Sequence, residues 1–303
     1  MPEVSVVIVC MNRPDILFPC LDSLKAYTTV SFETLVVTYL FSDDNLKALK
    51  ERYPWVTIVP SMALRGFSEN NNLALKQVKG RYCLILNDDT LQTMPLIDSL
   101  VKDMEALPEA AAAISPCIRF PDGRIQTCGR APWSPFRYAK HYLHLVDESR
   151  PNKWNLVSPS VFRTYTLNGA CFLIKTEAFR KAGWFDERFF FTPEDIALGH
   201  KLNDMGYSVW ADAGVSVTHI AGGSVSAMEQ AIKPARVRGS MIFYGEPLWL
   251  KCFVWCYEAL RAVKYFFLPR KGRNVIMRKT ALNVMEAVFS SESPKELFIK
   301  FRL

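Results

Sequence analysis

The sequence predicts an α/β protein, with a mostly parallel mixed sheet flanked by helices, followed by an amphipathic helical tail. Short, apolar, β-rich segments alternate with helical patterns from residue 4 to residue 90, which is typical of parallel strands joined by helices. The charge is also divided along the chain. Residues 1–232 carry 23 Lys and Arg against 25 Asp and Glu, whereas residues 233–303 carry 14 against 5. The net charges of −2 and +9 therefore indicate a near-neutral domain and a separate basic tail.

Four strands and three helices are predicted in the first half of the domain. The strands are Val4–Cys10, Thr34–Leu40, Val56–Pro60 and Tyr82–Leu86, and the helices are Pro14–Tyr27, Asp44–Tyr53 and Ser68–Val78. Parallel sheets bind ligands at the carboxyl ends of their strands, so the residues after each strand are candidate binding residues. Neither a G-x-G-x-x-G nor a Walker lysine motif occurs there, which disfavours ordinary dinucleotide and P-loop sites.

The second half has a less regular pattern. A helix is predicted at Met94–Leu107, and residues 116–159 are interpreted as a long functional loop region. Regular elements then return, namely strands at Ala170–Ile174, Tyr207–Ala211 and Val215–His219 and helices at Thr176–Ala182 and Thr192–Met205. His141 and His144 have a spacing that could suit a metal, but no Cys lies close in sequence, so a surface role is favoured.

The eight cysteines favour a reducing compartment. Most of them lie inside apolar segments and are interpreted as reduced core thiols of a cytosolic protein. Cys252 and Cys256 could begin a metal site, but no second Cys or His pair with ligand spacing follows. The N-terminus has no basic segment before its short apolar run, so no signal peptide is expected.

Carboxylates follow the fourth predicted strand directly. The apolar run that ends at Leu86 continues into Asn87, Asp88, Asp89 and Thr90. Hard oxygen ligands at this edge of a sheet suit Mg²⁺ or Mn²⁺ bound together with a diphosphate. The alternative is a solvated turn, because Asp and Asn also favour turns and helix caps.

Several segments together resemble family 2 glycosyltransferases. They are Val4–Arg13, Leu64–Asn72, Leu86–Thr90, Asn168–Ile174, Gly183–Phe190, Glu194–Asp195, Gly206–Tyr207 and His219–Ser224. The resemblance covers residues 4–225 and is strongest to the rhamnosyltransferase-like enzymes of bacterial surface-polysaccharide assembly. It implies a GT-A fold and an inverting transfer of a rhamnose-like sugar or another hexose. The donor would be a nucleotide-diphosphate sugar, and the acceptor a hydroxyl of a lipid-linked or cell-surface glycan.

The resemblance also implies a site. Residues 1–110 would form the nucleotide-sugar and metal half of the domain, and residues 111–232 the acceptor half. Asp89 and His219 would hold the divalent metal, and the imidazole favours Mn²⁺ over Mg²⁺. The residues implied to bind the nucleotide sugar are Cys10, Asn12, Arg13, Arg65, Gly66, Asn71, Asn87, Asp88 and Gly169.

By position, Asp195 resembles the general base that takes the proton of the acceptor hydroxyl. Glu194 would orient the acceptor or support the same turn. A structural alternative exists. The start of a helix is also typical of the segment Thr192–Asp195, because an acid is a common residue in the first turn of a helix.

Three residues depart from the family pattern. Thr38 stands where an Asp usually contacts the nucleobase, Leu64 stands where Asn is usual, and Ala197 stands where a further acid is usual. These departures motivate an alternative function, a catalytically inactive sugar-nucleotide-binding partner in a glycan-assembly complex.

The tail contains a long aromatic helix at residues 247–268. Its four charged residues, Lys251, Glu258, Arg261 and Lys264, lie within an arc of about 140° when drawn at about 100° per residue. With the basic residues that follow, it predicts contact between residues 247–279 and an anionic membrane surface. The protein would then lie on the cytoplasmic, inner face of the cell membrane. Packing on the catalytic domain or in a homodimer is the alternative, and nucleic-acid binding, which only the net charge suggests, is not expected.

Overall fold

The computed structural model describes residues 1–156, 158, 160–220, 228–269 and 272–302. The chain divides into two compact units. The sheet unit comprises residues 1–132, 148–186 and 195–221, and the helical unit comprises residues 133–147, 187–194 and 222–303. Residues 221–224 of the family pattern lie outside the described residues.

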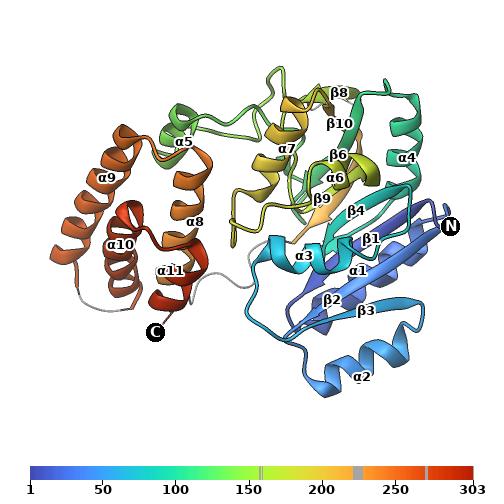
Figure 1. Cartoon of the computed structure of the whole chain (residues 1–303), viewed down its shortest axis with the longest axis horizontal. Helices are drawn as coiled ribbons and strands as arrows, with labels where there is room; N and C mark the ends of the chain where they lie inside the picture. Colours follow the sequence, from blue (N-terminus) through green and yellow to red (C-terminus); the bar gives the residue numbers. More distant parts are fainter. Residues whose placement is uncertain (157, 159, 221–227, 270–271, 303) are drawn as a thin grey trace. The chain divides into compact units, whose positions relative to one another are not determined.

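The sheet unit is built on a ten-stranded sheet in the order β3-β2-β1-β4-β9-β6-β10-β5, with β7 beside β6 and β8 beside β10. The strands are β1 (Val4–Cys10), β2 (Phe32–Tyr39), β3 (Val56–Ser61), β4 (Tyr82–Asn87), β5 (Thr90–Leu91), β6 (Ala111–Arg119), β7 (Ile125–Thr127), β8 (Val161–Thr164), β9 (Cys171–Lys175) and β10 (Ser208–His219). The strands β3, β2, β1 and β4 run parallel side by side (Figure 1). Since β9 runs antiparallel between β4 and β6, the sheet is mixed.

Two apolar clusters cover the two faces of this sheet. Alternate residues of β1 belong to opposite clusters, with Val6 and Ile8 in one and Val7 in the other. The first cluster includes residues of α1 (Pro14–Tyr27) and α4 (Leu96–Ala106), and the second includes residues of α3 (Phe67–Leu75), α6 (Thr176–Lys181) and α7 (Glu194–Asp204). The helix α2 (Asp43–Arg52) lies between β2 and β3 in the chain. A strand buried on both sides explains the continuous apolar run of β1.

The predicted loop at residues 116–159 is wrong in part. It contains the end of β6, all of β7 and the helix α5 (Pro135–Tyr142). β6 begins with three alanines and contains Pro116, so the two β-branched residues among its nine, Ile114 and Ile118, give only a weak strand signal in sequence. The two strands predicted at residues 207–219 form the single strand β10, whose pairing with β6 shifts between Asp212 and Ser216.

The helical unit contains α5, α8 (Glu229–Phe243), α9 (Leu248–Phe267), α10 (Arg273–Phe289) and α11 (Pro294–Phe301). The helix α10 packs against both α8 and α9, and α11 packs against α8 (Figure 1). Residue 232, the predicted end of the catalytic domain, lies inside α8. None of the helices in the described ranges combines the length and the apolar character needed to cross a membrane.

Candidate active site

The two predicted metal ligands lie together in the sheet unit. The antiparallel pairing of β10 with β5 places His219 opposite Thr90, next to the acidic residues that follow β4. The Nε2 atom of His219 lies 3.2 Å from Oδ1 of Asp89 and 3.3 Å from Nδ2 of Asn87. The backbone N–H of Ile220 also donates to the carbonyl of Asp89, at 3.0 Å. Asn87 and Asp89 therefore share one edge of the sheet with His219, which lies 132 residues from Asn87 in sequence.

Gln126 orients the imidazole ring of His219. Its Oε1 atom lies 2.8 Å from Nδ1 of His219. An amide oxygen only accepts hydrogen bonds, so Nδ1 donates here and Nε2 is the ring nitrogen that faces Asp89. Two ligands in neighbouring positions at about 2.1 Å from one ion lie about 3 Å apart, close to the observed 3.2 Å. The pair therefore fits Mn²⁺ or Mg²⁺. Within the described part of the chain, no group of three or more His, Cys, Asp or Glu residues forms a metal cluster.

Asp88 and Cys10 meet at the ends of the neighbouring parallel strands β4 and β1. Burial raises the pKa of Asp88 to about 6, while a hydrogen bond with Cys10 lowers it. Burial, and then the charge of Asp88, raise the pKa of the Cys10 thiol far above its usual range. The Sγ–H of Cys10 donates to the carbonyl of Arg13 at 3.5 Å. Cys10 and Asp88, two of the predicted nucleotide-binding residues, are thus in contact.

Asn12 and Arg13, which follow β1, make contacts within the chain. Oδ1 of Asn12 accepts from the backbone N–H of Ser42 at 3.0 Å and from Nδ2 of Asn45 at 2.8 Å. Asn12 adopts a φ of 51°, a left-handed conformation that Asn tolerates. Arg13 forms two hydrogen bonds with Asp15, at 2.8 and 2.7 Å. Asn12 therefore ties the end of β1 to the start of α2.

The predicted residues Arg65, Gly66 and Asn71 lie where β3 leads into α3. Gly66 is the N-cap of α3, and its N–H donates to Oε2 of Glu69 at 2.9 Å. Nη1 of Arg65 donates to Oγ of Ser61 at 3.1 Å. Asn71 is buried, and its Nδ2 donates to the carbonyl of Phe67 at 2.9 Å. The fold therefore already uses the Asn71 amide group within α3.

The predicted base, Asp195, lies in the first turn of α7 and forms an ion pair with Arg130. Nη1 of Arg130 donates to Oδ2 of Asp195 at 2.8 Å, and the N–H of Gly169 donates to the same oxygen at 3.1 Å. The other oxygen, Oδ1, accepts from the N–H of Ile196 at 2.7 Å. The Asp195 side chain keeps 14% of its surface exposed. The structure thus joins Gly169 to Asp195 and holds the carboxylate in a fixed orientation.

Arg130 is itself fixed by two further acceptors. Its Nε donates to Oε2 of Glu148 at 3.0 Å, and its Nη1 donates to the carbonyl of Leu167 at 3.0 Å. Gly129, just before it, has a φ of 89°, and a Cβ there would lie 2.5 Å from the carbonyl oxygen of Trp154. Only glycine fits this position without strain. A tight backbone turn and two acceptors therefore aim one guanidinium at Asp195.

Sequence reasoning missed Gln126, Arg130 and Glu148. All three lie in residues 116–159, the segment identified as a functional loop, but no motif marked them individually. Gln126 lies 93 residues from His219, and Arg130 lies 65 residues from Asp195. Contacts over such separations arise from the sheet topology and leave no local pattern in the sequence.

The remaining predicted residues have these positions. Glu194, the first residue of α7, is buried and belongs to the helical unit. The helix begins at Glu194, two residues after the predicted Thr192. Of the departures from the family pattern, Thr38 is buried near the end of β2, opposite Cys10 of β1, while Leu64 and Ala197 are partly exposed.

Two curated bacterial proteins are similar to this chain. The first is the O-antigen biosynthesis protein RfbC of Myxococcus xanthus, which is 30% identical over 227 residues. That match covers 72% of this chain but only 17% of RfbC. The second is the N-acetylglucosaminyl-diphospho-decaprenol L-rhamnosyltransferase of Mycobacterium tuberculosis, which is 28% identical over 219 residues. This match covers 66% of this chain and 71% of the relative.

Solved structures of glycosyltransferases share the fold. GalNAc-T7 with UDP, GalNAc and Mn²⁺ aligns with a TM-score of 0.60 and 15% identity, over 94% of this chain and 54% of that one. The mannosyltransferase PcManGT from Pyrobaculum calidifontis, with GDP-Man and Mn²⁺, aligns with a TM-score of 0.56 and 17% identity. This alignment covers 99% of this chain and 79% of that one. These likenesses confirm the GT-A fold predicted for the chain. Residues 2–235 match the family model described as glycosyltransferase like family 2. The chain therefore belongs to the family 2 glycosyltransferases, with a rhamnosyltransferase-like glycosyltransferase domain of GT-A fold.

Proposed function

We propose that the chain transfers a rhamnose-like sugar or another hexose from a nucleotide-diphosphate sugar to a hydroxyl of a lipid-linked or cell-surface glycan. One observation carries this proposal. The Asp89 and His219 pair, which suits a divalent ion, and the oriented carboxylate of Asp195 lie in the same compact unit. An inverting transfer needs both of these features, a site that stabilises a leaving diphosphate and a carboxylate that accepts a proton.

Asp89 and His219 would hold Mn²⁺ or Mg²⁺, with Asn87 and Asp88 beside them. The ion, when bound, offsets the negative charge that develops on the departing nucleoside diphosphate. Gln126 would keep the Nε2 lone pair of His219 directed at the ion. Cys10 and Asp88, which meet at the ends of β1 and β4, would line the adjoining nucleotide site.

Asp195 would take the proton of the acceptor hydroxyl while that oxygen attacks the anomeric carbon and the bond to the diphosphate breaks. The product carries the inverted anomeric configuration, and no covalent enzyme intermediate is needed. Arg130 and the N–H of Gly169 fix the carboxylate by donating to Oδ2. Oδ1 accepts from the N–H of Ile196 and keeps a second lone pair that can face the acceptor. Glu194 would support this turn from the preceding position in the chain.

The helix α9 supports a location at a membrane surface. Its buried residues include Leu250, Val254 and Glu258. Its large exposed apolar residues are Leu248, Trp249, Trp255, Leu260, Val263, Phe266 and Phe267. Three charged residues of α9, Lys251, Glu258 and Arg261, form ion pairs inside the helical unit, while Lys264 is exposed. The exposed apolar and aromatic side suits a helix lying in the plane of an anionic, cytoplasmic-face membrane. A lipid-linked acceptor would be found there.

The base assignment is tested with Asp195→Asn and, as matched control, Asp204→Asn at the exposed far end of the same helix. We expect Asp195→Asn to lower transfer by roughly 10²- to 10⁴-fold while donor binding stays nearly unchanged. Full transfer activity in that variant would contradict the assignment. A panel of nucleotide sugars, screened by thermal shift with Mn²⁺, identifies the donor first. Metal-dependent hydrolysis of that donor without acceptor distinguishes the enzyme from an inactive binding partner.

A further inference from the structure

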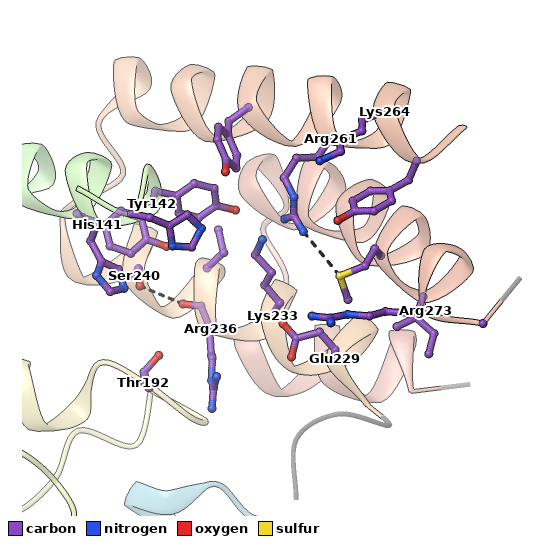
Figure 2. Close-up of a pocket in the computed structure, with 18 residues that line it drawn as sticks. His141, Tyr142, Thr192, Glu229, Lys233, Arg236, Ser240, Arg261, Lys264 and Arg273 are labelled. Atoms are coloured by element: carbon purple, nitrogen blue, oxygen red, sulfur yellow. Dashed lines mark hydrogen bonds between the residues drawn. The ribbon is translucent and has the colours of Figure 1, made fainter. Parts of the chain in front are cut away.

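The helical unit contains a large, half-open cavity that has no part in the chemistry described above. It has a volume of about 1430 Å³ and is lined by residues of α5, α8, α9 and the start of α10 (Figure 2). His141 and His144, which stood out in the sequence, line it too. A cavity of this size exceeds the usual range for a small-molecule site, so it has room for a sizeable ligand.

The lining of the cavity is strongly basic. Its cations are Lys233, Arg236, Arg261, Lys264 and Arg273, and its acidic residue is Glu229. Lys233 and Arg261 reach into the cavity from α8 and α9, and Arg273 enters from the start of α10 (Figure 2). The surplus of positive charge predicts an anionic ligand.

One buried carboxylate organises the centre of this cluster. Glu258 is fully buried and accepts from Nζ of Lys233 at 2.7 Å and from Nη1 of Arg261 at 2.8 Å. The hydroxyl of Tyr142 donates to the same carboxylate. Burial lowers the pKa of Lys233, whereas Glu258 raises it. A single carboxylate therefore fixes two cations and leaves one positive charge unbalanced.

The other cations add further positive charge, and Glu229 is the acidic residue that lines the cavity with them. Among the described residues, no carboxylate lies within ion-pair distance of Arg236, Lys264 or Arg273. Within the described part of the chain, the buried Nε–H of Arg236 has no hydrogen-bond acceptor, and its side chain extends toward Thr192 in Figure 2. A buried, unpartnered guanidinium N–H is costly unless a ligand supplies an acceptor. Phosphate oxygens suit Arg and Lys donors well.

The cavity borders the exposed apolar face of α9. Lys264 lines the cavity, and Leu260, one helical turn before it, belongs to the exposed apolar face with 73% of its surface exposed. Tyr257 and Tyr265 also line the cavity from the same helix. A ligand with a charged head and an apolar chain could therefore contact both surfaces at once.

We propose that this cavity binds the diphosphate group of an amphiphile whose apolar chain lies along the exposed face of α9. Resting on the proposed function, this amphiphile is the lipid-linked acceptor. The cations of the cavity supply all the positive charge that the diphosphate requires, so its binding needs no divalent metal. Nucleotide-sugar binding at Asp89 and His219, in contrast, depends on a metal.

The test measures binding to the full-length chain by calorimetry in EDTA, with farnesyl diphosphate, inorganic diphosphate and farnesol as probes. We expect farnesyl diphosphate to bind at least about tenfold more tightly than either of the others, because it alone engages both surfaces. Equal binding of inorganic diphosphate would show a site for free diphosphate and overturn the lipid assignment. Equal binding of farnesol would show that the cations are not used, and would also overturn it.

The variant Lys264→Gln/Arg273→Gln removes two exposed cations of the cavity. Its matched control, Lys279→Gln/Arg302→Gln, removes the same residue types from exposed positions of the helical unit outside the lining. We expect the first to weaken farnesyl diphosphate binding at least about tenfold and the control to weaken it less than about twofold. An equal loss of farnesyl diphosphate affinity in the two double variants would show that only the net charge of the protein matters, and would overturn the proposal. Metal-dependent donor binding, measured on the same variants, reports separately on the proposed function.

Discussion

Gln126 orients the imidazole ring of His219, but no sequence motif identifies it. Its amide lies 2.8 Å from the ring of His219, across 93 residues of chain, and determines which imidazole nitrogen faces Asp89. The carboxylates after β4 and the histidine at the end of β10 could be predicted, because a strand end and a family pattern mark each of them. The residue that orients the histidine could not, because no local pattern in the three-residue strand β7 distinguishes Gln126.

Replacing Gln126 with Leu should weaken metal binding without unfolding the protein. The ring of His219 would lose the acceptor that fixes its tautomer, and loss of such a partner costs about 10- to 100-fold in metal affinity. Titration of Mn²⁺ against donor-dependent activity measures the change. The control Gln77→Leu removes an exposed amide from the surface and should leave the Mn²⁺ requirement unchanged. An unchanged Mn²⁺ requirement in Gln126→Leu would remove Gln126 from the site.

Asp103 gives a prediction about pH. Burial, together with the neighbouring carboxylate of Asp212, raises the pKa of Asp103 to about 6 in the folded protein, above its ordinary value of 3.8. The folded chain therefore binds this proton more tightly than the unfolded chain, and the stabilisation is lost as the pH rises from about 4 through about 6. Asp103→Asn should raise the melting temperature at about pH 7.5 relative to wild type, and the gain should shrink toward about pH 4.

Asp98, on the same helix, provides the control of opposite sign. Burial alone would raise its pKa, but hydrogen bonds from Thr29 and Val30 lower it below its ordinary value. Its stabilisation is present above the unfolded pKa and is lost as the pH falls through the folded one. Asp98→Asn should therefore lower the melting temperature at about pH 7.5. Equal effects of Asp98→Asn and Asp103→Asn at that pH would contradict both assignments.

At the scale of elements, the position of α7 determines where Asp195 lies. A Cβ at Gly199 would lie 2.7 Å from Cα of Thr166, so the helix approaches this segment closely only because residue 199 is glycine. Gly199→Ala should displace α7 and lower kcat by at least about tenfold, since small misplacements of catalytic groups are costly. Lys201→Ala, on an exposed position of the same helix, should leave kcat unchanged. Wild-type kcat in Gly199→Ala would show that this close approach is not needed.

The elements that could be predicted share a clear local signal. β1 and α1 have their predicted bounds, because a β-branched apolar run and a proline at the helix start define them. Strand β6 was missed, because its alanines bury well at the centre of a sheet but give no strand signal. Strand β8 was also missed, since its four residues pair only with β10, which lies far along the chain.

At the scale of the molecule, the uneven distribution of charge along the sequence follows the two structural units. Most of the basic surplus belongs to the helical unit, where five of the cations line the cavity. Cys252 and Cys256 are exposed on α9, whereas the other six cysteines are buried. The interpretation of the cysteines as core thiols is therefore wrong for these two.

The outward face of α9 yields a prediction for the whole protein. Leu260→Gln/Val263→Gln should reduce cosedimentation with anionic vesicles, since each exposed apolar side chain buried in the interface adds about 1 to 2 kcal/mol. The control Met205→Gln/Val161→Gln makes similar changes at exposed apolar positions of the sheet unit. Vesicle binding that is unaffected by the α9 changes would exclude this face as the membrane contact.

Because the Glu258 side chain is buried within the helical unit, α9 is not suited to transfer to another protein. As an isolated peptide, or grafted to the end of another protein, this helix would present a carboxylate whose Lys233 and Tyr142 partners remained behind on α8 and α5. Its aromatic face would then have no rigid support and would be prone to self-association. Whatever surface α9 contacts, it is a fixed part of the helical unit and not a transferable anchor.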